Sequence, residues 1–171
     1  MKAVLCDFDG VLCILNKASA IESFNGYKNK LKLSPDEILA NYFYSNPFAY
    51  QIDMGQISYT EMLELIQPDC WIGESNDWIK LWQSIWDCYS VSTNLTKALT
   101  NLHKSGGYIG IITDNHREFR KWLLSTHPQM FEFSSHLICS AELEICKPDK
   151  QIFEYALNKL GRSEEHTSEL Q

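Results

Sequence analysis

The sequence lacks the features of a membrane, secreted or nucleic-acid-binding protein. Its first apolar run is cut by a carboxylate at Asp7, too early for a secretory signal, and no other apolar run is long enough to span a membrane. No Lys/Arg-rich run offsets the formal net charge of -7, which disfavours contact with phosphodiester backbones. We therefore expect a cytoplasmic protein with neither nucleic acid nor membrane as a partner.

The sequence also lacks any paired cysteine motif. Its six cysteines form no C-x-x-C pair, the spacing typical of zinc sites and thiol redox motifs. Their scattered positions suit buried or idle thiols in a reducing compartment. With 44% hydrophobic residues, the 171-residue chain is able to bury a sizeable core. The composition therefore predicts one compact unit, with room for an inserted second one.

Apolar runs and turn signals predict strands that alternate with helices. The run at residues 2–6 leads into an Asp-Phe-Asp-Gly turn, and a second run at residues 108–112 follows the helix-stop pair Gly106-Gly107. A third strand signal comes at residues 136–139. An amphipathic helix is predicted between the last two strands, and another one from Pro148.

A long, mostly helical stretch separates the first two strands. Ser-x-x-Glu capping boxes at Ser34 and Ser58 mark helix starts within it. Three tryptophans recur every four residues and share one helix face, which either fills the core of a helical subdomain or forms an aromatic wall beside a substrate pocket: Trp78, Trp82 and Trp86.

This order of elements predicts an α/β fold, with a Rossmann-like three-layer core around a parallel sheet and an inserted α-helical cap. We place the core at residues 1–14 and 96–161 and the cap at residues 15–95. Residues 162–171 bear no relation to the preceding helix and resemble the translation of a sequencing-library adapter. We expect them to be a non-native tail and leave them out of the fold.

Candidate catalytic residues follow the predicted strands. Asp7 and Asp9 lie at the ligand-binding edge of a parallel sheet, where two carboxylates suit a nucleophile with an acid/base partner, although Asp-Gly is also typical of a solvated turn. Thr113 ends the second strand, where its hydroxyl and the following amides suit either a phosphate oxygen or a plain helix N-cap. Lys147 suits either the neutralisation of phosphate or a surface position.

Together these residues resemble the motifs of the haloacid dehalogenase-like (HAD) superfamily. In that family one hydrophobic strand ends in Asp-x-Asp-Gly, a second ends in Thr or Ser, and Lys-Pro follows. Asp7-Phe8-Asp9-Gly10, Ile111-Ile112-Thr113 and Lys147-Pro148 match in that order, within residues 1–161. The insertion after the first motif is similar to that of subfamily IA-like phosphatases, and Met54-Gly55-Gln56-Ile57-Ser58 resembles their sugar-phosphate-type caps.

The resemblance implies a Mg²⁺-dependent phosphatase. Asp7 would attack phosphorus and form an aspartyl phosphate, while Asp9 would protonate the leaving alcohol and then activate water. Mg²⁺ would be held by Asp7, by the backbone carbonyl of Asp9 and by an acidic fourth motif. Thr113, Asp114 and Lys147 would bind the phosphoryl group, although many relatives carry Asn where this chain carries Asp114.

The fourth motif is not found in the chain. In the family it closes a further strand, which here would fall beyond the last residue. Glu164, Glu165 and Glu169 lie in the suspected tail with no strand to direct them, so we do not assign them as metal ligands. We therefore expect a C-terminally truncated chain with impaired activity.

The predicted function is hydrolysis of a small phosphorylated substrate, possibly a sugar phosphate. One alternative is a sugar phosphomutase, whose cap would hold a second phosphate through basic residues such as Lys28, Lys30 and Lys32. The other alternative is a non-enzymatic phosphoacceptor switch, which also uses Asp, Thr or Ser, Lys and magnesium. The long insertion between Asp7 and Thr113 argues against the switch.

Overall fold

A parallel sheet lies at the centre of the computed structural model, which describes residues 3–134 and 136–161. Its three strands have the order β1-β4-β5. The register pairs Asp7 with Ile112 and Thr113 with Cys139, so all three strands end at one edge. The predicted strands are confirmed with small shifts in their bounds: β1 Ala3–Asp7, β4 Tyr108–Thr113 and β5 His136–Cys139.

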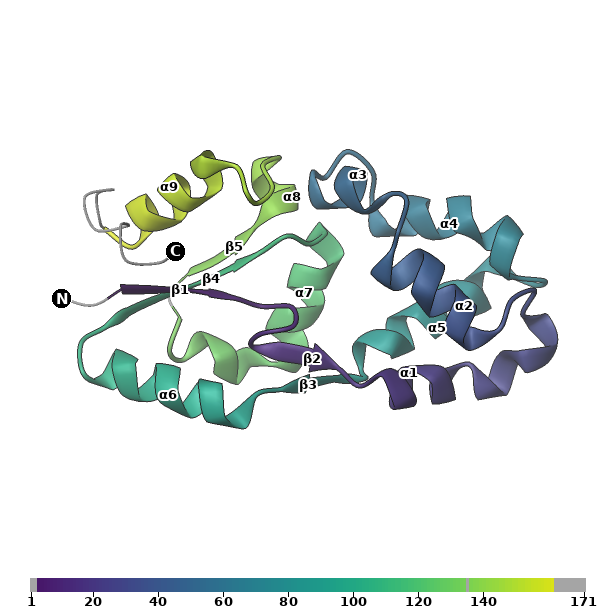
Figure 1. The fold of residues 1–171 in the computed structure, drawn as a ribbon, viewed down its shortest axis with the longest axis horizontal. Coiled ribbons are helices and arrows are strands. Elements are labelled where there is room, and N and C mark those ends of the chain that lie inside the picture. The colour runs from purple at the N-terminus through teal and green to yellow at the C-terminus, as the bar shows by residue number, and fades with distance from the viewer. Residues whose placement is uncertain (1–2, 135, 162–171) are drawn as a thin grey trace.

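Helices cover both faces of this sheet (Figure 1). Side chains alternate along a strand, so Ile111 packs in the cluster that includes Phe119, whereas Ile112 packs with Ile152 on the other face. One face is covered by α6 Thr93–Lys104 and α7 Arg117–Thr126, and the other by α9 Lys150–Lys159. The predicted α/β class with a three-layer core is confirmed.

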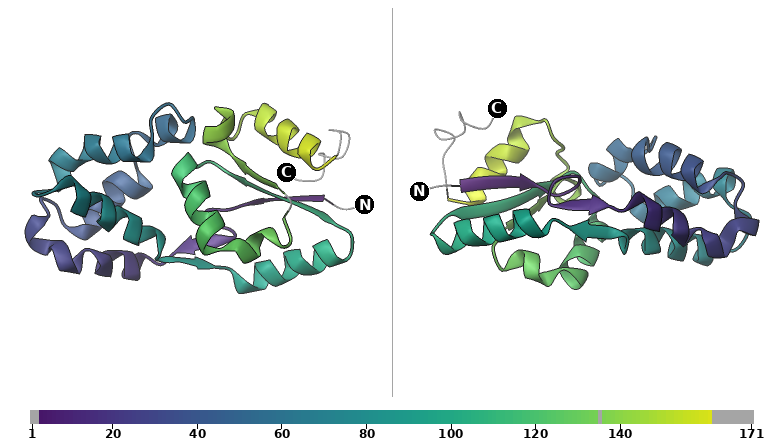
Figure 2. Two further views of the ribbon diagram at one scale, coloured as in Figure 1. Left: turned by 180° about the vertical axis from the view of Figure 1, so that it is seen from behind. Right: turned by 60° about the horizontal axis from the view of Figure 1, so that its bottom comes forward.

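The helical region, residues 17–86, lies beyond one end of the sheet (Figure 2). It has its own buried cluster, which contains Phe24, Leu63 and Trp78. The division into a core and a cap at residues 15–95 stays a prediction. The region comprises α1 Lys17–Ser23, a 3-10 turn Asn25–Lys30, α2 Pro35–Leu39, a π-helical turn Ala40–Tyr44, α3 Ala49–Asp53, α4 Tyr59–Cys70 and α5 Ser75–Trp86.

A short antiparallel pair joins the helical region to the sheet. It consists of β2 Cys13–Leu15 and β3 Tyr89–Val91, with Leu15 opposite Tyr89. The sequence analysis did not predict these strands, because three residues are too few to show a period of two. Both chain crossings between the sheet and the helical region therefore run side by side.

Local helix signals were confirmed at most positions. Ser34 and Ser58 each form a complete capping box. The helix predicted to start at Pro148 begins instead at Lys150, because the Asp149 side chain accepts the N–H of Gln151 and caps it there. The remaining short elements are η3 Pro128–Phe131 and α8 Ser140–Leu143.

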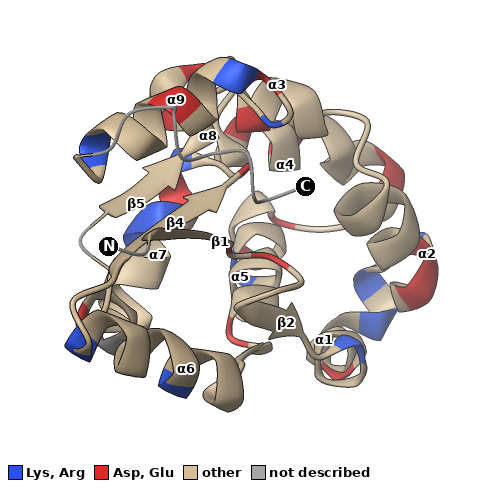
Figure 3. Cartoon of the chain, turned by 60° about the vertical axis from the view of Figure 1, so that its left-hand side comes forward, with Lys and Arg blue, Asp and Glu red and all other residues tan. Residues whose placement is uncertain are grey.

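Lys and Arg residues are dispersed over several helices (Figure 3). Among the described residues, no helix is long and apolar enough to cross a membrane. All six cysteines are free. The suspected tail, residues 162–171, lies outside the described residues.

Two leucines of α4 provide a test of the helical packing. Leu63 is 0% exposed in the helical core, whereas Leu65 on the same helix is 53% exposed. We expect Leu63→Ala to lower the free energy of unfolding by about 2–5 kcal/mol, because it leaves a cavity. Leu65→Ala is the matched control and should change it by less than about 0.5 kcal/mol. Urea unfolding would measure both, and equal losses would contradict this packing.

Candidate active site

Asp7 and Asp9 flank the carboxyl end of β1. Asp7 is the last residue of the strand, and the chain then turns at Gly10, whose φ of +75° is readily adopted only without a side chain. The turn is closed by the N–H groups of Leu12 and Cys13, which donate to the Phe8 carbonyl at 2.9 Å. The turn therefore leads directly into β2 and holds the acidic pair at the sheet edge.

Lys147 reaches the first of these carboxylates from the loop after α8. Its Nζ lies 2.8 Å from Asp7 Oδ1, and the Phe8 N–H donates to the same oxygen at 2.8 Å. Both donors engage Oδ1, so Oδ2 of Asp7 is the oxygen that faces neither of them. Two residues 140 positions apart are thus brought together as predicted, with only 22% of the lysine side chain exposed.

Thr113 ends β4 with its hydroxyl buried. The residue is 1% exposed, and Oγ1 has no hydrogen-bond partner among the described residues. Buried hydroxyls are rarely left unbonded, because nothing then offsets their desolvation. The Asn115 N–H, one of the amides predicted to receive phosphate, donates instead to Ser140 Oγ at 3.0 Å. The helix α7 starts only at Arg117 and is capped by His116.

Asp114 supports the lysine loop. Its Oδ1 accepts the Lys147 N–H at 3.0 Å, which ties the loop after α8 to the end of β4. Burial raises the pKa of this carboxyl, and the charge of Asp7 adds to the shift. A carboxylate cannot donate to phosphate, so the predicted phosphate contact at Asp114 is left to its main-chain N–H.

Asp9 is held by a buried tyrosine. The Tyr89 hydroxyl donates to Asp9 Oδ2 at 3.2 Å. Although Asp9 as a whole residue is exposed, partial burial of its carboxyl raises the pKa, and the charge of Asp7 raises it further against the effect of the Tyr89 hydrogen bond. A carboxyl that keeps its proton more readily suits a general acid.

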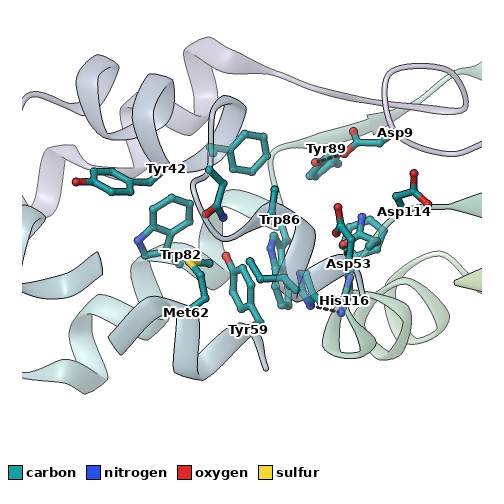
Figure 4. Close-up of a pocket in the computed structure, with 16 residues that line it drawn as sticks. Asp9, Tyr42, Asp53, Tyr59, Met62, Trp82, Trp86, Tyr89, Asp114 and His116 are labelled. Carbon is teal, nitrogen blue, oxygen red and sulfur yellow. Dashed lines mark hydrogen bonds between the residues drawn. The ribbon is translucent and has the colours of Figure 1, made fainter. Parts of the chain in front are cut away.

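A pocket of about 180 Å³ opens beside the acidic pair, between the sheet edge and the helical region. Figure 4 shows Asp9, Asp53 and Asp114 at one end and Tyr42 and Trp82 at the other. Asp7, Thr113 and Lys147 do not line the pocket but lie beyond its acidic end. The predicted tryptophan stripe serves both purposes considered, since Trp82 and Trp86 are core residues that also line the pocket.

Comparison with known proteins agrees with this geometry. A family model described as haloacid dehalogenase-like hydrolase matches residues 1–167. The chain belongs to this family. No curated protein sequence matches it significantly.

Solved structures of HAD proteins share the fold of this HAD-like hydrolase. The HAD family enzyme bt-2542 from Bacteroides thetaiotaomicron, in complex with magnesium and inorganic phosphate, is 18% identical with a TM-score of 0.64, over 95% of this chain and 80% of that one. A HAD phosphatase from Thermococcus onnurineus is 21% identical with a TM-score of 0.60, over 94% and 72%. A candidate β-phosphoglucomutase from Thermotoga maritima is 14% identical with a TM-score of 0.62, over 94% and 71%.

The donor set at the sheet edge fits a magnesium ion in part. Mg²⁺ prefers oxygen ligands and keeps several waters. The Asp7 carboxylate is one oxygen donor, and the Asp9 carbonyl, which accepts none of the hydrogen bonds that close the following turn, is another. Among the described residues, no group of three or more His, Cys, Asp or Glu is arranged as a metal site. Glu164, Glu165 and Glu169 lie outside those residues.

The sequence analysis missed most residues that line the pocket, among them Asp53, Tyr89 and His116. Burial raises the pKa of Asp53 to about 7, and the charges of Asp114 and Asp9 add to it against that of Lys147. Asp53 lies just before the segment 54–58, which was singled out, but nothing local showed that it faces the sheet. Tyr89 and His116 carried no signal either, since their roles depend on contacts distant in sequence.

His116 is buried and stacked. Its Nδ1 accepts the Phe119 N–H at 3.0 Å and lies 3.3 Å from Glu118 Oε2. Burial lowers the pKa of the ring, whereas the contact with Glu118 raises it. The Tyr59 ring stacks on the imidazole with centroids 4.2 Å apart, which fixes this wall of the pocket.

The unpartnered hydroxyl of Thr113 predicts an unusual response to mutation. We expect Thr113→Val to leave the free energy of unfolding unchanged or raise it by up to about 1 kcal/mol, because a desolvated group without a partner is removed. The control Ser140→Ala should lower it by about 1–3 kcal/mol, since its buried hydroxyl accepts the Asn115 N–H. Chemical unfolding compares the two, and an equal loss in Thr113→Val would mean that its hydroxyl is bonded.

Proposed function

We propose that this chain is a Mg²⁺-dependent phosphomonoester hydrolase that acts on a small phosphorylated metabolite through an aspartyl phosphate on Asp7. The observation that carries the proposal is the 2.8 Å contact between Lys147 Nζ and Asp7 Oδ1 at the sheet edge, with Asp9 two residues away. A nucleophile, a fixed cation and an acid/base group thus meet beside a pocket.

The first step would transfer the phosphoryl group to the protein. Oδ2 of Asp7 forms a bond to phosphorus as the bond from phosphorus to the leaving oxygen breaks, and Asp9 gives its proton to that oxygen. Lys147 offsets negative charge near the phosphoryl oxygens, and the Thr113 hydroxyl gains a partner there. The alcohol part of the substrate would occupy the pocket lined by Asp9 and Asp114.

The second step would release phosphate. Asp9, now ionised, takes a proton from water, the water oxygen bonds to phosphorus, and the bond from phosphorus to the Asp7 oxygen breaks. The products are inorganic phosphate and free Asp7. Mg²⁺ would be held by the Asp7 carboxylate and the Asp9 carbonyl, with waters as further ligands, and would supply charge neutralisation for the phosphoryl group.

Neither alternative is favoured by the pocket. A phosphomutase needs basic groups for a second phosphate, but no Lys or Arg is among the described residues that line this pocket. Of the lysines considered for that role, Lys30 pairs with Asp77 at 2.7 Å and Lys32 donates to the Pro68 carbonyl at 2.6 Å, both within the helical region. A phosphoacceptor switch does not need a general acid such as Asp9 beside a substrate pocket.

Phosphate release with and without metal tests the proposal. We expect the purified chain to hydrolyse p-nitrophenyl phosphate and sugar phosphates with Mg²⁺ at an impaired rate, because its described residues hold no complete metal site, and to lose this activity in EDTA. Asp7→Asn should reduce turnover at least about a thousandfold, because the nucleophile is lost. Borohydride trapping followed by mass spectrometry should locate the acyl phosphate at Asp7 during turnover.

The matched control is Asp87→Asn, an exposed aspartate at the end of α5 that does not line the pocket. It should keep wild-type turnover. Hydrolysis by Asp7→Asn at the wild-type rate, or trapped phosphate at another residue, would exclude the proposed nucleophile.

A further inference from the structure

The two ends of the pocket differ in chemistry. Three carboxyl groups line the end near the phosphoryl position, from Asp9, Asp53 and Asp114, and no Lys or Arg is among the described residues of the lining. The far end is walled by aromatic rings: Tyr42, Phe43, Tyr59, Trp82 and Trp86. The alcohol part of a phosphate ester bound here would therefore contact the three carboxyl groups first and the aromatic rings farther into the pocket (Figure 4).

Asp53 is the acid that the helical region contributes. It is the last residue of α3, and the loop after it contacts α7 and α8 beside the parallel sheet. Arg117 donates to the Gly55 carbonyl at 3.4 Å. A Cβ at Gly55 would lie 2.5 Å from the Ala141 carbonyl, so the backbones touch here. This contact holds Asp53 at the acidic end of the pocket, near Asp9 and Asp114.

The aromatic end contains a polar atom without a partner. Trp82 is 1% exposed, and its indole N–H has no hydrogen-bond partner among the described residues. A buried donor of this kind is expected to find a partner in a ligand. Hydroxyl oxygens would supply acceptors, and the C–H groups of the same ligand would pack against the rings.

The carboxyl groups and the aromatic rings of the pocket would interact differently with leaving groups that carry a second anion, an ammonium group or only uncharged hydroxyls. A second anion would face Asp53 and its two acidic neighbours with no Lys or Arg in the described lining, which is unfavourable. An ammonium group would suit the carboxylates and rings but leave the Trp82 N–H without an acceptor. An uncharged, hydroxylated group satisfies the carboxylates, the indole and the ring faces together.

We infer that Asp53 determines specificity, and that the site takes phosphomonoesters of uncharged polyhydroxylated alcohols, such as polyols and sugars, while it rejects substrates with a second anionic group. This inference rests on the proposed hydrolase function. Asp53 acts by its charge at the acidic end of the pocket, at a pH above its pKa of about 7, and takes no part in the bond changes at phosphorus.

A pair of nearly isosteric substrates tests the charge effect. Glycerol 3-phosphate and 3-phosphoglycerate differ in a CH₂OH group against a carboxylate. We expect wild-type kcat/KM to favour the uncharged ester by at least about tenfold, because like charges oppose binding. Asp53→Asn should narrow this ratio at least about fivefold, mainly through a gain with 3-phosphoglycerate. Asp53→Glu should keep the preference, and Asp87→Asn should match wild type.

The outcomes separate the two levels of the proposal. If no ester, p-nitrophenyl phosphate included, is hydrolysed with Mg²⁺, the hydrolase function fails and this inference fails with it. If esters are hydrolysed but the ratio is unchanged in Asp53→Asn, only the role of Asp53 is overturned. A preference for phosphoethanolamine over glycerol 3-phosphate would overturn the uncharged class of substrate.

The hydrogen bond between Tyr89 and Asp9 carries a second inference independently. Tyr89 is 9% exposed and belongs to β3, while Asp9 lies in the turn that leads into β2. The pairing of Leu15 with Tyr89 fixes the phenol relative to that turn. Since Asp9 Oδ2 accepts the hydrogen bond from the Tyr89 hydroxyl, a proton on the Asp9 carboxyl would be carried by Oδ1. We propose that Tyr89 is a positioning residue for the acid.

Leaving-group dependence tests this role. A nitrophenolate departs without protonation, whereas an alkoxide does not. In the first turnover, Tyr89→Phe should slow alcohol release from glycerol 3-phosphate about tenfold and change nitrophenol release by less than about twofold. Tyr27→Phe, a hydroxyl deletion in the helical region away from the pocket, should change neither. Equal slowing of both esters, or of neither, would show that Tyr89 does not position the acid.

Discussion

The parallel pairing of β4 with β1 on one side and β5 on the other is the constraint on which the site depends. Parallel strands place their carboxyl ends at one edge, so segments far apart in sequence converge there. Asp7 and Thr113 arrive on neighbouring strands, and Lys147 follows the third. The hydrogen bond from the Lys147 amide to Asp114 then holds the lysine loop against the end of β4. Because β4 pairs with β1, the same register brings Lys147 to Asp7.

This convergence has an electrostatic cost. Four carboxyl groups, those of Asp7, Asp9, Asp53 and Asp114, gather around one lysine ammonium, and the phosphoryl group proposed to bind there is itself an anion. Raised pKa values at Asp9, Asp53 and Asp114 lessen the repulsion, since each group keeps its proton more readily. A divalent cation beside Asp7 would offset the remainder, which is a physical reason to expect metal dependence from the residues themselves.

The sequence was most informative where a signal is local. Apolar runs that end in Asp7 and Thr113 predicted both strands and their edge, and Ser-x-x-Glu predicted both capping boxes, because backbone and side-chain geometry within a few residues decides these features. Tyr89 and Asp53 were missed, since only tertiary contacts show that a phenol in a three-residue strand meets Asp9. The predicted start of α9 at Pro148 was wrong for a local reason. The Asp149 side chain accepts the Gln151 N–H, so Asp149 caps the helix and α9 begins at Lys150.

The groups proposed to act on phosphorus and the residue proposed to select the substrate are held in place by different parts of the fold. Asp7 and Thr113 end strands of the sheet, and Asp9 and Lys147 lie in segments that follow strands, so the strand register positions them. Asp53 instead depends on close approach between two backbones, because a side chain at Gly55 would meet the Ala141 carbonyl and its φ of +66° is strained for other residues. A bulkier residue at Gly55 would displace Asp53 and leave the Asp7–Lys147 pair intact. Selectivity can therefore change through one loop without change to the sheet edge.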